Sequence, residues 1–390
     1  MEIRHKGIPT VRIITDPEKS ARVVGLRYVS DAMPGIRRKK AGKGFRFIST
    51  GGKTISDANR LGRIRSLAIP PAWRDVWICP IENGHLQATG RDVRGRKQHR
   101  YHRRWREVRD EAKFNRIMVF AKALPKIRRR AAHDAKGAGL PRKKVLATLV
   151  QLLEVSLIRV GNEEYARNNH SFGLTTMRDK HVKVSGSTMR FEFRGKSGKH
   201  HAIDVLDKRM AKIVKRCQDI PGQDLFQYLD DDGKRQNVKS EDVNGYLREI
   251  AGEDFTAKDF RTWAGTVLAA MALREFEKFD TQARAKRNLM QAIESVAQKL
   301  GNTPAICRKC YVHPAILESY LDGSLLETLK QRAEAEMKSS LHKLHPEEAA
   351  VLSLLQQRLA RKVEPLEKTL RRRLAQMKKR SGKSSRSSVQ

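Results

Sequence analysis

The sequence has few cysteines and no long apolar run. Four cysteines in 390 residues are too few for a disulfide framework and fit a reducing compartment. No run of about 18 apolar residues is present, and the opening MEIRHK leads into no apolar segment. The sequence therefore predicts neither a membrane span nor a secretory signal, and we expect a cytoplasmic protein.

Acidic residues are also scarce relative to basic ones. The chain has 81 Lys and Arg against 43 Asp and Glu, which gives a formal net charge of +38. A charge of this size repels itself unless a polyanion neutralises it, and nucleic acid is the natural counterpart.

The length and the 39% of hydrophobic residues suffice for two packed domains. After a polar arm over residues 1–24, short apolar runs separated by Gly, Pro and Asn predict a small antiparallel-sheet domain over residues 25–105. The runs are GLRYVS, FRFIST, VWICPI and HLQATGRD. Between them we expect a helix, with Ser56 and Asp57 as its cap signal and Pro70 and Pro71 as its stop.

From residue 106 to residue 345, apolar residues recur at spacings of three and four, which predicts a larger, mainly helical domain. Within it, the runs HVKVSG, MRFEFRG and HHAIDV predict a three-stranded antiparallel meander. A charged helix over residues 346–370 and a disordered basic tail over residues 371–390 complete the chain. The predicted fold class is α+β.

The densest basic segment is RDVRGRKQHRYHRRWR, which begins at Arg91 and includes two aromatic residues. Cations can hold phosphates and rings can lie against sugars or bases, so the segment predicts a DNA-binding surface rather than a merely solvated loop. The candidate contact residues are Arg91, Arg94, Arg96, Lys97, Arg100 and Tyr101.

Five further residues suit the cleavage of a nucleic-acid strand by a protein nucleophile. Such cleavage needs the nucleophile, fixed cations around the phosphate and an acid for the leaving 5′ oxygen. The residues are Arg159 at the end of an apolar helix, Lys196 in the turn RGKSGK, Arg261 in KDFRTWAGT, and Asn302 and Tyr311 in LGNTPAICRKCY. Taken singly, they are typical of helix caps, solvated turns and half-buried core.

In this order and combination, the segments resemble the catalytic set of type IB DNA topoisomerases, in particular the short bacterial and poxvirus-like branch. IPPAW, GHLQATGRDVRGRKQHRYH and RVGNEEYARNNHSFGLTTMRDKHV extend the resemblance over residues 25–329. It implies the catalytic fold shared with tyrosine recombinases, and an enzyme that relaxes supercoiled duplex DNA without ATP, metal or another cofactor. It also implies a nucleoid-associated monomer that clamps DNA.

The resemblance implies a role for each of the five residues. Tyr311 corresponds to the nucleophile that forms a 3′-phosphotyrosine, Arg159 and Arg261 to ligands of the phosphate oxygens, and Lys196 to the proton donor for the departing 5′ oxygen. Asn302 stands where poxvirus and eukaryotic members have His. An amide can donate a hydrogen bond to the phosphate but is no general base, so the resemblance assigns no base to Tyr311.

Two alternative functions differ from this interpretation. A tyrosine recombinase or integrase uses a similar catalytic set but typically has His in an H-x-x-R motif where this chain has Lys258. We interpret Lys258 either as a residue that assists near the phosphate and binds DNA or as a surface lysine. A histone-like packaging protein would explain the charge but not the five catalytic segments.

Cys307 and Cys310 form a C-x-x-C pair close to His313, a pattern that suggests zinc. No second C-x-x-C or His pair lies within range, so we expect reduced thiols beside Tyr311 and no metal. We expect Gly265 and Gly301 to serve close helix packing and turns rather than phosphate binding.

Overall fold

The computed structural model describes residues 17–230, 232–276, 279–329 and 344–360. The chain divides into two compact units, Met1–Arg116 and Ile117–Gln390. The division falls within helix α3 (Arg103–Asp134), beyond the boundary expected at residue 105. Among the described residues, no helix is long and apolar enough to cross a membrane.

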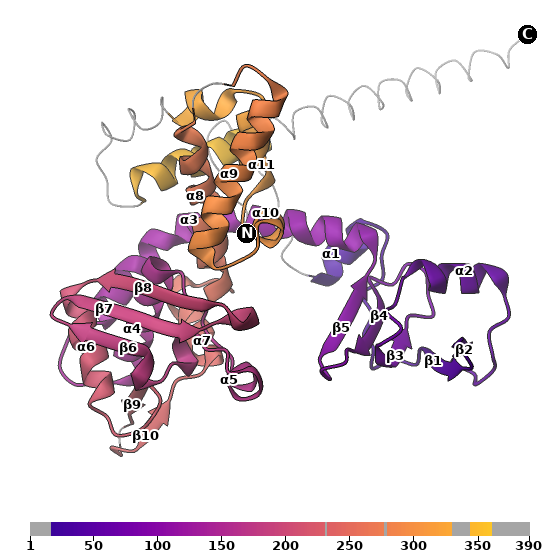
Figure 1. Ribbon diagram of the computed structural model, residues 1–390, viewed down its shortest axis with the longest axis horizontal. Coiled ribbons are helices and arrows are strands. Elements are labelled where there is room, and N and C mark those ends of the chain that lie inside the picture. The colour runs from indigo at the N-terminus through magenta and orange to yellow at the C-terminus, as the bar shows by residue number, and fades with distance from the viewer. Residues whose placement is uncertain (1–16, 231, 277–278, 330–343, 361–390) are drawn as a thin grey trace, which may run out of the picture. The chain divides into compact units, whose positions relative to one another are not determined.

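The first unit is built on a five-stranded antiparallel sheet with the order β2-β1-β3-β4-β5 (Figure 1). Its strands are β1 (Ile36–Ala41), β2 (Gly44–Ile48), β3 (Arg74–Ile78), β4 (Leu86–Arg91) and β5 (Lys97–Tyr101). Helix α1 (Pro17–Val23) precedes the sheet and lies within the expected polar arm, whose residues 1–16 are outside the described residues.

Helix α2 (Ala58–Ser66) connects β2 to β3 and covers one face of the sheet. Its cap is the one predicted, because the Asp57 carboxylate accepts a hydrogen bond from the Arg60 main-chain N–H at 2.7 Å. Ile64 of α2 packs against Val76, Ile78 and other residues of this face, which alternate along the strands with residues of the opposite face.

The predicted strands of this unit are confirmed in part. FRFIST, VWICPI and HLQATGRD overlap β2, β3 and β4. The expectation of a strand at GLRYVS is wrong, since this run contributes one isolated bridge from Arg27 to Gly84. Strands β1 and β5 were missed because their sequences, IRRKKA and KQHRY, are dominated by charged and polar side chains. Their pairing along the sheet, not apolar alternation, makes them strands.

The second unit contains the predicted meander, formed by β6 (Val182–Ser185), β7 (Thr188–Arg194) and β8 (His200–Leu206). Helices α4 (Arg142–Ser156) and α6 (Lys208–Gln218) pack against it (Figure 1). Helix α4 is apolar on nearly every side and is the centre of the core. A two-stranded hairpin, β9 (Gln227–Leu229) and β10 (Arg235–Asn237), was not expected.

The other helices of the second unit are α5 (Glu163–Asn169), α7 (Ser240–Ala251), α8 (Ala257–Arg274), α9 (Gln282–Leu300), α10 (Pro304–Cys310) and α11 (Pro314–Leu321). Helix α8 contacts α9 and α11, and α9 contacts α10. Short 3-10 turns occur at Leu174–Thr176, Asp179–His181 and Lys196–Gly198.

A further helix over residues 346–360 coincides with the start of the expected charged helix. It is not a solvated appendage, because Val351, Leu354 and Leu355 are buried in the same core as α4. The rest of the expected helix and the basic tail lie outside the described residues.

Candidate active site

Arg159 lies in a segment after α4 that is neither helix nor strand, not at the end of the helix as the sequence suggested. The helix ends at Ser156, and Leu157 adopts a left-handed conformation (φ 55°) that turns the chain. One terminal N–H group of Arg159 donates to Asn302 Oδ1 at 2.5 Å and to the Gly301 carbonyl at 3.4 Å. Burial lowers the pKa of Arg159, and the Tyr311 side chain counteracts this effect through its charge.

Arg261 is on the buried face of α8, where only 4% of its surface is exposed. It donates to the main-chain carbonyls of Leu157 and Leu300, the second at 2.6 Å, and its Cζ lies 5.3 Å from the centre of the Tyr311 ring. Burial first and the charge of Arg159 second lower the pKa of Arg261 to about 10, while the charge of Tyr311 and a hydrogen bond with it act in the opposite direction. Arg261 is therefore charged at neutral pH.

No carboxylate of the described residues compensates the charges of these two arginines. Within the part of the chain that the structure describes, the hydrogen bonds of Arg159 and Arg261 go to main-chain carbonyls, to an amide and to the Tyr311 side chain, and neither arginine forms an ion pair. The Nε atom of Arg261 is buried without a hydrogen-bond partner among the described residues. A buried guanidinium group beside a half-buried one, neither of them paired with a carboxylate of the described residues, is a site for an anion.

Tyr311 directly follows α10 and is held close to α8. A Cβ atom on Gly265 would lie 2.8 Å from the Tyr311 carbonyl oxygen and 3.1 Å from its Cβ, so only glycine permits this approach. The Thr266 hydroxyl is within hydrogen-bond distance of the same carbonyl, at 3.3 Å. The expected role of Gly265 in close helix packing is confirmed.

Asn302 lies in the turn between α9 and α10, directly after Gly301, which ends α9 in a left-handed conformation (φ 59°). The turn expected at Gly301 is thus confirmed. Since Oδ1 of Asn302 accepts from Arg159, the amide is oriented, and its Nδ2 is buried with no partner among the described residues. Asn302 therefore has a hydrogen-bond donor available for a ligand.

Lys196 is in the turn between β7 and β8, as predicted, and its side chain is exposed. Its hairpin reaches the Asn302 turn through Lys199, whose Nζ donates to the Asn302 carbonyl at 3.0 Å. The structure thus brings Arg159, Arg261, Asn302 and Tyr311 into contact, and places Lys196 on a hairpin joined to them.

Lys258 occupies an exposed position on α8, about one turn before Arg261. Its main-chain carbonyl accepts a hydrogen bond from the Thr262 hydroxyl at 3.1 Å, which is a helix contact and not a contact with the site. Its role in binding DNA stays a prediction.

Cys307 is the buried residue of α10, and burial raises the pKa of its thiol to about 11. Cys307 and Cys310 are both free thiols. His313 begins α11, and its Nδ1 accepts a hydrogen bond from the Ala315 main-chain N–H at 3.1 Å. Among the described residues, no group of three or more His, Cys, Asp or Glu side chains is arranged to hold a metal ion.

His201 of β8 is a residue of this site that sequence reasoning missed. Together with Arg159, Arg261, Lys299 and others, it lines a small cavity beside the arginines. The run HHAIDV indicated a strand, but nothing in the run distinguishes His201 from its exposed neighbour His200.

In the first unit, the predicted DNA-contact residues surround β5, the edge strand of the sheet. Two of them are paired with acids: Arg96 with Asp92 at 2.7 Å and Lys97 with Asp31 at 2.6 Å. The bond from Arg96 is the main reason why the pKa of Asp92 is lowered to about 2. These two cations are therefore less available to phosphates than the sequence suggested.

The other predicted contacts have no carboxylate partner among the described residues. Arg91 donates to the Gly95 carbonyl at 2.9 Å, Arg100 donates to the Ala68 carbonyl at 2.8 Å, and the Tyr101 ring is stacked with His99 at a centroid distance of 5.7 Å. The side chain of Arg94 is exposed.

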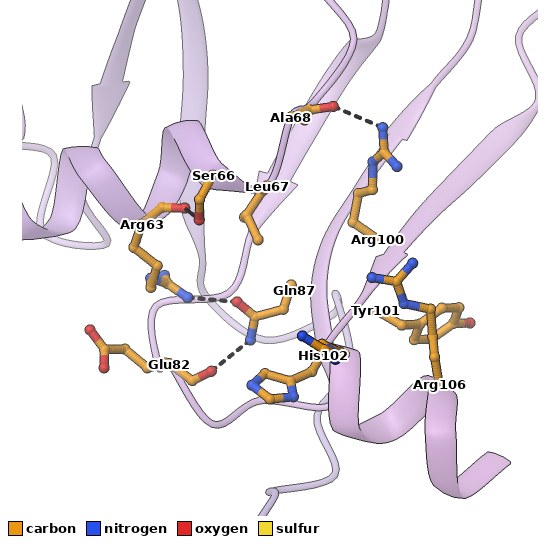
Figure 2. Close-up of a pocket in the computed structure, with 11 residues that line it drawn as sticks. Arg63, Ser66, Leu67, Ala68, Glu82, Gln87, Arg100, Tyr101, His102 and Arg106 are labelled. Carbon is orange, nitrogen blue, oxygen red and sulfur yellow. Dashed lines mark hydrogen bonds between the residues drawn. The ribbon is translucent and has the colours of Figure 1, made fainter. Parts of the chain in front are cut away.

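Arg100 also lines a pocket of about 480 Å³ between the end of α2 and β5 (Figure 2). Arg63, Arg103 and Arg106 line it as well, whereas Glu82 is the acidic residue in its lining. As Figure 2 shows, Arg63 donates to Gln87, whose amide in turn donates to the Glu82 carbonyl, at 2.8 and 2.9 Å. The pocket is cationic, and Arg63 lies outside the basic segment that the sequence singled out.

Both units contain segments that match families of known proteins. Residues 102–340 match the family model described as eukaryotic DNA topoisomerase I, catalytic core, and residues 44–92 match bacterial DNA topoisomerase IB, N-terminal domain. DNA topoisomerase 1B of Acanthamoeba polyphaga mimivirus is 34% identical over 295 residues, which cover 74% of this chain and 88% of the relative. DNA topoisomerase 1B of vaccinia virus (strain Copenhagen) is 23% identical over 62% of this chain and 75% of the relative.

The chain therefore belongs to the type IB DNA topoisomerases, enzymes of the isomerase class that act on DNA. Within that family, the bacterial N-terminal match and the viral relatives fit the bacterial and poxvirus-like branch. The resemblance stated from the sequence and the predicted fold class are both confirmed, and all five candidate catalytic residues lie within the match to the catalytic core.

Proposed function

We propose that this topoisomerase relaxes supercoiled duplex DNA by cutting one strand with Tyr311 and rejoining it, without ATP or an obligatory metal ion. The observation that carries this proposal is the pair formed by half-buried Arg159 and buried Arg261 next to Tyr311, with no carboxylate partner among the described residues. They form an anion site beside a hydroxyl nucleophile, as attack on a phosphodiester requires.

In the cleavage step, the Tyr311 oxygen forms a bond to the scissile phosphorus, and the bond from phosphorus to the 5′ oxygen breaks. Arg159, Arg261 and the Asn302 Nδ2 donate hydrogen bonds to the non-bridging oxygens, where negative charge accumulates. The Tyr311 proton passes to solvent, and Lys196 gives a proton to the departing 5′ oxygen. The products are a 3′-phosphotyrosine and a free 5′-hydroxyl.

Religation is the reverse of this step. A phosphodiester is exchanged for a phosphotyrosine diester, so bond free energy is nearly conserved and ATP is not required. Torsional strain in the DNA gives the direction, provided that the duplex beyond the nick can rotate. The cations near β5 and in the pocket of Figure 2 would hold duplex DNA by its phosphates. We expect a monomer to be sufficient, since every proposed catalytic group lies in one chain.

The test compares the wild type with Tyr311→Phe on negatively supercoiled plasmid, in EDTA and without ATP. Topoisomers are followed on a gel, and protein–DNA adducts are trapped with detergent. We expect relaxation and adducts with the wild type, and DNA binding without either for Tyr311→Phe, which lacks one oxygen. Relaxation by Tyr311→Phe, or a requirement of the wild type for ATP or magnesium, would refute the proposal.

A further inference from the structure

The His201 ring lies between two turns that carry residues of the active site. It is stacked on Phe193 with a centroid distance of 5.0 Å and an interplanar angle of 15°. On one side, a Cβ atom on Gly195 would lie 2.7 Å from Cδ2 and Nε2 of the ring, and on the other, a Cβ atom on Gly301 would lie 2.2 Å from Cε1. The ring thus fills the space that side chains at both glycines would need.

Each of these two glycines directly precedes a residue of the proposed active site. Gly195 directly precedes Lys196, and Gly301 directly precedes Asn302. The imidazole therefore packs the hairpin of the proposed proton donor against the turn that holds the proposed phosphate ligand. The second link between them, from Lys199 to the Asn302 carbonyl, is made by an exposed side chain and is expected to be weaker.

His201 is also surrounded by positive charge. Arg159, Arg261 and Lys299 line the same cavity, and Lys199 and His200 neighbour it on its own hairpin. Burial first, and then the charges of Arg159, Arg261, Lys199 and His200, lower the pKa of His201. Its Nε2 is buried and has no hydrogen-bond partner among the described residues. The ring is therefore neutral at physiological pH, and protonation would place another cation among the arginines.

We propose that His201 is a positioning residue for proton transfer: its ring docks the Lys196 hairpin on the Asn302 turn and so aims the Lys196 ammonium at the 5′ oxygen. This inference rests on the proposed function of Lys196 as proton donor. It assigns no direct contact with DNA to His201. Loss of the ring should loosen the hairpin, while Arg159 keeps its hydrogen bonds to the Asn302 turn and Arg261 keeps those to α9 and to the segment after α4.

The experiment measures single-turnover cleavage of a duplex with a normal scissile phosphate and of one whose 5′ bridging oxygen is replaced by sulfur. A thiolate leaving group, with a pKa of about 8.5, departs without a proton, so the second substrate bypasses the acid. We expect His201→Ala to cleave the normal duplex about 10- to 100-fold more slowly, the loss that a misplaced catalytic group produces. It should cleave the sulfur duplex within about threefold of the wild-type rate.

His200→Ala is the matched control, because His200 is the exposed neighbour on the same strand, and it should behave like the wild type on both substrates. Lys196→Ala separates the inference from the function on which it rests. If sulfur rescues Lys196→Ala but not His201→Ala, the positioning role is refuted and the acid stands. If sulfur rescues neither, the acid assignment fails and the inference fails with it. An unchanged rate for His201→Ala also refutes it.

A second variant keeps the inference testable if His201→Ala does not fold. Gly195 has an ordinary extended backbone (φ −96°), so Gly195→Ala brings no backbone strain and its methyl group meets the His201 ring. We expect Gly195→Ala to slow cleavage of the normal duplex and to be rescued by sulfur. In the double variant with His201→Ala, the added methyl group should have no further effect, because the ring that it strikes is gone. Additive losses would contradict the docking role.

Discussion

Glu348 is expected to fix the helix of residues 346–360 to the rest of the second unit. Its carboxylate accepts two hydrogen bonds from Arg128, at 2.8 and 2.9 Å, and one from the Trp263 indole N–H at 2.9 Å. Arg128 also pairs with Glu154 at 2.6 Å. Replacing Glu348 by Ala would leave the indole N–H unpaired and Arg128 with a single partner.

The expected loss is about 3–4 kcal/mol, because removing one partner of a buried ion pair costs about 3–5 kcal/mol and Arg128 retains Glu154. For a unit of this size, each kcal/mol lowers Tm by roughly 2–4 °C. We therefore expect Glu348→Ala to lower the Tm of the second unit by roughly 10 °C. Glu347→Ala is the matched control, since Glu347 is exposed at the adjacent position, and its effect should stay within about ±0.5 kcal/mol.

The difference in Tm between Glu348→Ala and the wild type should become smaller at acid pH. Burial alone would raise the pKa of Glu348, but the hydrogen bonds and charge of Arg128 lower it overall, whereas burial dominates at Glu154 and raises its pKa. A carboxylate with a lowered pKa contributes stability above its unfolded pKa of about 4.3, and the contribution is lost as pH falls through the folded pKa. A Tm difference below about 2 °C at pH 7, or one that grows below pH 4, would refute this account.

Three further predictions concern the site and the DNA surface. Asn302→Ala should slow single-turnover cleavage about 100- to 1000-fold, the loss expected from one phosphate donor, with little change in noncovalent DNA binding; a loss below about fivefold would argue against its role. Arg106→Gln should make the slope of log K for DNA binding against log salt shallower by about 1, because Arg106 lines the cationic pocket. Arg96→Gln should change this slope less, because Arg96 pairs with Asp92, and equal changes in the two variants would contradict the prediction. Because the pKa of His201 is lowered, its neutral form stabilises the fold above about pH 6.5, and this contribution is lost as pH falls through the folded pKa. In thermal melts, the Tm of His201→Ala should therefore fall less than the Tm of the wild type between pH 7 and pH 5.

The catalytic set could be predicted from the sequence because each residue stands in a distinctive local segment. Arg261 and Tyr311 lie where the segments KDFRTWAGT and LGNTPAICRKCY place them, on α8 and directly after α10. The position of Arg159 was less accurate, since a left-handed Leu157 ends α4 before it, and non-glycine residues in that conformation are not apparent from apolar periodicity.

His201 and the pocket in the first unit could not be predicted in the same way. The contact of His201 with Gly301 joins segments about 100 residues apart, and no local pattern marks it. Arg63 lines the pocket from α2, and Arg100 lines it from β5. Strand β5 itself could not be predicted, because its sequence is charged and shows no apolar alternation. By contrast, the spacing of Val351, Leu354 and Leu355 does indicate a buried helix face. We interpreted this segment from its charge and therefore did not predict that it is buried.

The electrostatics of the arginine pair give a physical reason why a neutral donor suits position 302. Burial and the charge of Arg159 lower the pKa of Arg261 to about 10, which shows that the two guanidinium groups already repel each other. A protonated histidine beside Arg159 would add a third cation where no carboxylate that the structure describes compensates the first two. Asn302 instead accepts a hydrogen bond from Arg159 and leaves its buried Nδ2 as a donor without adding charge. The same argument applies to His201, which can line this cavity because its ring is neutral. Asn302 and His201 therefore position the groups of the site, and the positive charge comes from Arg159 and Arg261.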